Sequence, residues 1–69
     1  MDITSFQAAE EYYTLLAVRA DGVAPVMDLV MAEGLDAATA AARAMLNEHA
    51  SCASVEIWRG GRLLDQVSR

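Results

Sequence analysis

The sequence predicts an α+β fold of the order β-β-α-β-β, in which one long helix lies on one face of a four-stranded antiparallel sheet. Leu35 to His49 is rich in Ala and repeats its apolar residues with the period of an amphipathic helix. Tyr12 to Ala20 is rich in residues that favour strands. Ser54 to Val67 is divided by Gly60-Gly61, a pair typical of a two-residue hairpin turn. The helix is therefore flanked by strands on both sides.

Residues 1–10 precede these elements. Thr4 and Gln7 have the spacing of a capping box, which predicts a short helical turn here. A loosely packed tail is the alternative interpretation. The whole chain, 1–69, is short enough to form a single domain.

The first strand, Tyr12 to Ala20, is apolar on both of its alternating faces. Such a strand is expected at the centre of a sheet, with both faces in contact with other groups. One face carries Tyr13, Leu15 and Ala17, and the other carries Tyr12, Thr14, Leu16 and Val18. Asp21-Gly22 then predicts a hairpin turn.

The second strand is predicted over Val26 to Ala32. Pro25 has no N–H to donate to a sheet, so this strand is expected to begin after it and to lie at an edge. A competing interpretation makes Pro25 the first residue of a short helix that ends at Gly34. The order of the strands in the sheet stays open.

The helix over 35–49 is expected to begin with Asp36 as its N-cap, because a carboxylate accepts the unpaired N–H groups of a first turn. Gly34 would allow the chain to turn sharply just before it. Its predicted apolar side consists of Ala38, Ala41, Ala42, Met45, Leu46 and His49, and its polar side of Asp36, Thr39, Arg43 and Asn47.

The last hairpin follows a connector over 50–53. A two-residue turn at Gly60-Gly61 pairs Arg59 with Arg62, Trp58 with Leu63, Ile57 with Leu64, and Glu56 with Asp65. Val55, Ile57 and Leu64 then face the helix, and Glu56, Trp58, Leu63 and Asp65 face away from it.

One helix can cover only one face of this sheet, which leaves the other face open. That face would carry Trp58 and Leu63 together with Tyr12 and Leu16 of the first strand. An exposed apolar patch of this kind marks an interaction surface. Because 55% of the residues are apolar in a chain this small, we expect a homodimer or a permanent protein partner. The alternative is that residues 1–10 fold back over the patch.

Composition narrows the class of partner and the compartment. The net charge is −5 with no Lys, which is the reverse of the basic surface that nucleic-acid binding or membrane-surface binding requires. The sequence shows no signal peptide and no membrane span, and its single Cys52 excludes an internal disulfide. We therefore expect a cytoplasmic protein, and the Ala-rich, Lys-free composition indicates a bacterial origin.

No residue pattern predicts catalysis, a cofactor or a metal. A zinc site needs four ligands, so His49 and Cys52 could form one only together with the same residues of a second chain. We instead interpret Cys52 as a small buried apolar residue and His49 as a favourable charge at the end of the helix. Met27, Met31 and Met45 are expected to fill the core. We therefore expect that the protein is not an enzyme.

The two guanidinium groups of Arg59 and Arg62 flank the Gly60-Gly61 turn, where backbone N–H groups are also exposed. Guanidinium and N–H groups together are able to contact an anion. A solvated turn without a ligand is the alternative.

Val55 to Leu64, V-E-I-W-R-G-G-R-L-L, resembles the last hairpin of a family of short uncharacterised bacterial β-β-α-β-β proteins, which reads V-E-[LVI]-W-x-G-x-R. The likeness extends over Tyr12 to Val67 and implies the fold, but it implies no activity. A weaker likeness, from Tyr13 to Met45, is to the N-terminal part of HicB-type antitoxins, which neutralise a small basic toxin. The Pro that usually precedes Asp28-Leu29 in those proteins is missing here.

The sequence thus favours a small protein-interaction module that self-associates and has no catalytic activity. The alternative is an antitoxin-like acidic protein that neutralises a small basic partner. A third interpretation is a protein that binds a small anion through Arg59 and Arg62.

Overall fold

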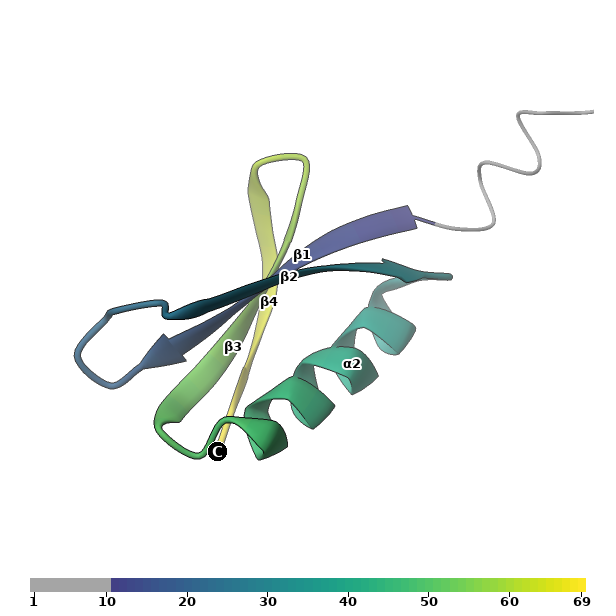
Figure 1. The fold of residues 1–69 in the computed structure, drawn as a ribbon. Coiled ribbons are helices and arrows are strands. Elements are labelled where there is room, and N and C mark those ends of the chain that lie inside the picture. Colours follow the sequence, from purple (N-terminus) through teal and green to yellow (C-terminus); the bar gives the residue numbers. More distant parts are fainter. Residues whose placement is uncertain (1–10) are drawn as a thin grey trace, which may run out of the picture.

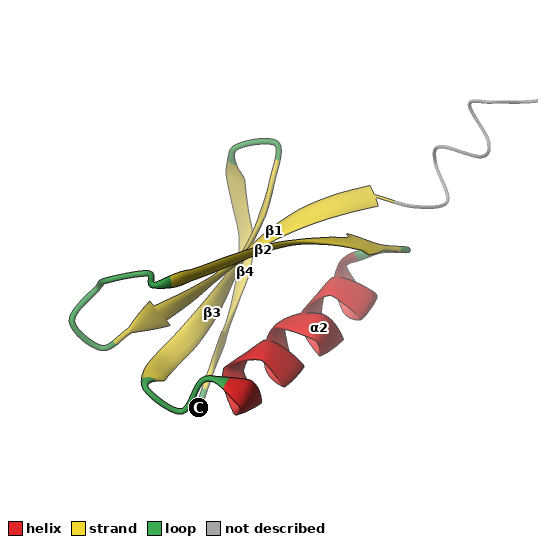
Figure 2. Cartoon of the chain, viewed as in Figure 1, coloured by secondary structure: helices red, strands yellow, loops and turns green. Residues whose placement is uncertain are grey.

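The computed structural model describes residues 11–69, which form an α+β fold with one helix against one face of a four-stranded antiparallel sheet (Figures 1 and 2). The elements in chain order are β1 (Glu11–Arg19), β2 (Val26–Ala32), α2 (Leu35–Glu48), β3 (Cys52–Arg59) and β4 (Arg62–Ser68). The predicted β-β-α-β-β order is confirmed. The helical turn predicted at Thr4 to Gln7 lies outside the described residues.

The strands lie in the order β2-β1-β3-β4 in the sheet. β1 is therefore central, as its two apolar faces predict, and β2 is an edge strand. The segment 26–32 is a strand, and the alternative helix after Pro25 is wrong. α2 ends at Glu48 and β3 begins at Cys52, so the connector after the helix is 49–51, one residue shorter than the predicted 50–53.

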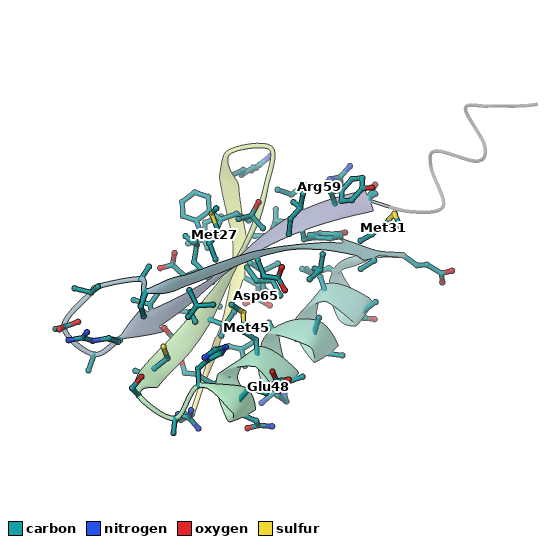
Figure 3. The ribbon with its side chains drawn as sticks, in the orientation of Figure 1. Met27, Met31, Met45, Glu48, Arg59 and Asp65 are labelled. Carbon is teal, nitrogen blue, oxygen red and sulfur yellow. The ribbon has the colours of Figure 1, made fainter. Side chains whose placement is uncertain are left out.

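The core lies between α2 and the face of the sheet that β1 and β3 dominate. Ala38 and Ala42 are fully buried, and their small side chains let the helix axis come close to the sheet. Met45, farther along the same side of α2, lies between the helix and the sheet (Figure 3). The buried core consists of Tyr13, Leu15, Ala17, Ala38, Ala42, Met45, Leu46, Cys52, Val55, Ile57 and Val67.

The helix begins at Leu35, as predicted, but its N-cap lies two residues before the predicted one. Gly34 holds the N-cap position with an extended backbone, and its carbonyl accepts a hydrogen bond from the N–H of Ala38 at 3.0 Å. The predicted N-cap, Asp36, is wrong because the chain already enters the helix at Leu35. Asp36 is in the first turn instead, where its carboxylate still interacts favourably with the positive end of the helix dipole.

The guanidinium group of Arg69 caps the other end of α2. Its Nε donates to the carbonyl oxygen of Cys52 at 2.8 Å, and its Nη2 donates to the carbonyl oxygens of His49, at 2.9 Å, and of Leu46. The cation at the negative end of the helix dipole therefore comes from the residue after β4. α2 has no basic side chain in its own last turn.

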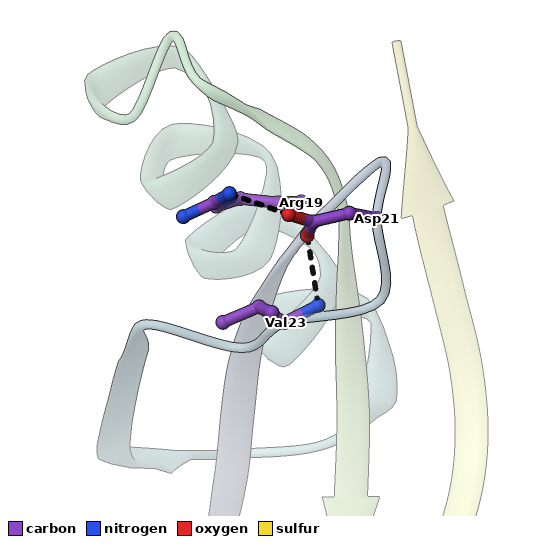
Figure 4. A network of polar contacts seen from close by, with 3 residues as sticks. All are labelled: Arg19, Asp21 and Val23. Atoms are coloured by element: carbon purple, nitrogen blue, oxygen red, sulfur yellow. Dashed lines mark hydrogen bonds and ion pairs between the residues drawn. The ribbon is translucent and has the colours of Figure 1, made fainter.

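The loop between β1 and β2 is held by Asp21 (Figure 4). One carboxylate oxygen of Asp21 accepts a hydrogen bond from the N–H of Val23 at 3.0 Å, and the other forms an ion pair with Arg19. Gly22 has a φ of 88°, which only Gly adopts readily. The predicted turn at Asp21-Gly22 is confirmed, although the connection from Arg19 to Val26 is longer than a two-residue loop.

The β3–β4 hairpin turns at Gly60-Gly61, where both residues have positive φ angles of 58° and 75°. Its predicted pairs Arg59–Arg62 and Trp58–Leu63 are confirmed. The predicted pairs Ile57–Leu64 and Glu56–Asp65 are wrong, because the register shifts between Ile57 and Trp58.

The shift places Ile57 opposite Asp65 and Glu56 opposite Gln66. A bulge inserts one residue and thereby exchanges the two faces of the strand beyond it. Val67 is buried as a result and pairs with Val55 under the helix, whereas Leu64 is 38% exposed. Leu64 and Val67 are three residues apart, so a regular strand could not turn both toward the helix.

We expect Arg69→Ala to lower the free energy of unfolding by about 1–2 kcal/mol, because carbonyl groups at the helix end lose a charged donor. Urea unfolding measures the change. Arg43→Ala, which removes an exposed Arg from α2, is the matched control and should change the free energy by less than about 0.5 kcal/mol. Equal effects of the two substitutions would contradict the capping role.

Candidate functional site

The face of the sheet opposite α2 has no helix against it within residues 11–69. We call it the open face. Its members follow from the strand pairs, in which residues directly opposite each other point to the same side. The open face consists of Tyr12, Thr14, Leu16, Val18, Met27, Leu29, Met31, Ser54, Glu56, Trp58, Leu63, Gln66 and Ser68. Met27 and Met31 point away from the helix, in contrast to Met45 (Figure 3).

Large apolar side chains dominate the exposed part of the open face. The exposed fractions are 72% for Met27, 63% for Leu29, 61% for Tyr12, 54% for Met31 and 47% for Leu63. Side chains of this kind rarely gather in one exposed patch unless the patch contacts another molecule.

The structure places all four residues of the predicted interaction surface on the open face. Tyr12 and Leu63 are exposed, whereas Leu16 and Trp58 are half-buried. Trp58 lies opposite Thr14 of β1, and Thr14 lies opposite Leu29 of β2, so one row of side chains crosses the whole sheet.

Sequence reasoning missed the contribution of β2, which supplies the three most protruding aliphatic side chains, Met27, Leu29 and Met31. The prediction that Met27 and Met31 fill the core is wrong, although the same prediction for Met45 is confirmed. Successive side chains of a strand point to opposite faces of the sheet, and this period was the available signal. It directs both of these Met residues to the face that Val26 and Val30 do not occupy.

The open face is nearly free of charge. Glu56 is its one charged residue among those that the structure describes, and its Oε1 accepts a hydrogen bond from Nε1 of Trp58 at 2.9 Å. Asp28 and Asp65 point to the helix side, because they pair with Leu15 and Ile57. Among residues 11–69, the other carboxylates therefore lie outside the open face.

The two Arg residues of the hairpin have different surroundings. Nη2 of Arg59 lies 2.8 Å from Oε1 of Glu11, and its guanidinium carbon lies 5.9 Å from the centroid of the Tyr13 ring. Arg59 is thus engaged with β1, while Arg62 is exposed at the turn. An anion at the turn would have to compete with Glu11 for the guanidinium group of Arg59.

Tyr13 joins the same cluster. Its hydroxyl donates to Oε2 of Glu11 at 2.9 Å, and the residue is only 2% exposed. Burial raises the pKa of Tyr13 above its ordinary value of 10.0, the hydrogen bond and the negative charge of Glu11 raise it further, and the charge of Arg59 lowers it. The neutral phenol is therefore part of the folded structure.

His49 and Cys52 lie at the end of α2 and the start of β3. Cys52 belongs to the core and is 2% exposed, which confirms its interpretation as a small buried apolar residue. Its N–H donates to the carbonyl oxygen of His49 at 2.9 Å. Within residues 11–69, no three His, Cys, Asp or Glu side chains are grouped so as to hold a metal ion.

None of the helices in the described part of the chain has the length and apolarity needed to cross a membrane. Comparisons of the chain with protein-family models, with curated proteins and with solved structures found no match in any of the three. The likenesses to short bacterial β-β-α-β-β proteins and to HicB-type antitoxins therefore stay predictions.

We expect the free energy of unfolding to fall as the pH rises above about 10 toward the folded-state pKa of Tyr13, because the folded chain holds this proton more tightly than the unfolded chain. Tyr13→Phe should make this decline shallower. Glu11→Gln should also do so, because it removes the negative charge that helps to raise the pKa. Urea unfolding between pH 9 and pH 12 measures the slopes, and equal slopes in Tyr13→Phe and the unaltered chain would contradict the assignment.

Proposed function

We propose that the protein is a small interaction module that self-associates through the open face and has no catalytic activity of its own. The observation that supports this proposal is the continuous apolar surface across β2, β1 and the β3–β4 hairpin. Moving such a surface out of water is the main driving force of protein association.

A specific interface would take a modest share of the surface of this chain. The accessible surface of the chain is 4670 Å², and a standard interface takes about 800 Å² from each partner, roughly a sixth of this area. Met27 and Met31 are flexible enough to fill gaps between two packed surfaces, and Tyr12 and Trp58 are of the types that dominate binding energies.

The low charge of the open face favours a second copy as the partner. In a two-fold dimer each surface meets itself, so a charged face would repel its own copy. Glu56 is the one charged group of the face among the described residues, and its carboxylate is already bonded to Trp58. Two packed open faces would thus bring together only one carboxylate from each described chain segment, and that carboxylate already accepts a hydrogen bond.

The antitoxin-like alternative depends on acidic side chains, because a basic partner is recognised by negative charge. The carboxylates of Asp28 and Asp65 lie on the helix side of the sheet. A basic partner would consequently bind outside the open face and leave its apolar residues exposed. Self-association accounts for these residues, so we favour it.

We expect Leu29→Glu to raise the dimer dissociation constant at least about tenfold, because the substitution places a carboxylate in the middle row of the open face. Leu29 is 63% exposed, so the monomer fold should tolerate the change. Light scattering over a series of concentrations measures the mass in solution.

Ala40→Glu is the matched control for this experiment, because it adds the same charge at an exposed position of α2, away from the sheet. We expect the control to dimerise like the unaltered chain. A monomeric unaltered chain, or an equal loss of mass in the two variants, would contradict the proposal.

A further inference from the structure

A groove of about 310 Å³ lies between the edge strand β2 and the C-terminal half of α2, on the helix side of the sheet. It exists because the helix presents the small side chains of Ala41 and Ala44 toward β2. Asp28 lies between Val26 and Val30 in the helix-facing row of β2. Its side chain is exposed, so it does not close the space between β2 and the helix.

The floor of the groove is apolar. Leu15, which is 1% exposed, lies directly opposite Asp28 in the sheet, and Val30 and Met45 line the groove beside it. Apolar surfaces with a few polar groups at the edge are typical of small-molecule sites, and about 300 Å³ is the lower end of their volume range.

Both walls of the groove carry a carboxylate. Asp28 is on the strand wall and Glu48 is on the helix wall, with the imidazole of His49 beside it. No Arg lines the groove. Neither carboxylate forms an ion pair with any of residues 11–69, and Asp28 accepts a hydrogen bond only from the N–H of Leu29, its neighbour in the chain. The groove thus combines an apolar floor with two carboxylates that have no ion-pair partner among residues 11–69.

We propose that this groove binds a small organic cation. An ammonium group between the carboxylates of Asp28 and Glu48 would form charge-assisted hydrogen bonds, which are stronger than neutral ones. A short hydrocarbon body attached to it would lie on Leu15, Val30 and Met45 and leave water. The groove lies on the helix side of the sheet, so cation binding does not require self-association through the open face. Met27 is the one residue of the open face that also lines the groove.

The test is a titration of the ¹⁵N-labelled full chain with n-hexylammonium, followed by amide chemical shifts. We expect saturable shifts at Val30, Ala44 and Glu48, and a dissociation constant at least about tenfold lower than that of 1-hexanol, the neutral molecule of the same shape. Failure to saturate, or equal affinity for the two molecules, would overturn the proposal.

Two substitutions test whether the carboxylates of the groove contact the ammonium group. Asp28→Asn and Glu48→Gln should each weaken hexylammonium binding at least about threefold, whereas Glu33→Gln, which removes an exposed carboxylate outside the groove, should leave it unchanged. Glu48 is exposed on the helix, so this variant serves even where Asp28→Asn disturbs the sheet. Equal weakening by Glu33→Gln would show that net charge alone attracts the cation, and would overturn the site.

Discussion

The packing of α2 against β1 and β3 is the interaction on which the rest of the structure depends. Ala38 and Ala42 are fully buried and bring the helix close to a row of side chains that includes Leu15 and Ile57. The described chain has one helix and a sheet with two faces, so this close contact completes one face only. The apolar side chains of the other face are left for association. Two further small residues of α2, Ala41 and Ala44, leave the groove beside β2.

The two surfaces differ in charge, and this difference separates the partners that we propose for them. The open face has one charged residue among those described, Glu56, which accepts a hydrogen bond from Trp58, and so low a charge suits contact with an identical surface. The groove has carboxylates on both walls and no Arg, which suits a cation. The alternation of side chains along β2 produces both properties, because Leu29 and Asp28 point to opposite sides of the same strand.

Periodicity and turn residues were sufficient to predict the order of the elements, the central position of β1 and the open face itself. They could not predict features that depend on contacts distant in sequence. The bulge turns Val67 into the core that the sheet shares with α2, and Arg69 caps a helix whose last carbonyls lie about twenty residues earlier. Met27 and Met31 were assigned to the core because their apolar type was considered without the register that directs them outward.

The most direct test of self-association through the open face is an isotope-filtered nuclear Overhauser experiment on an equal mixture of labelled and unlabelled chain. The account predicts contacts between copies that join the methyl groups of Met27, Leu29 and Met31 to the rings of Tyr12 and Trp58. Three results would contradict this account. The first is a set of contacts between copies that involves only α2, and the second is a lack of contacts between copies at a concentration where light scattering detects a dimer. The third is a chain that stays monomeric.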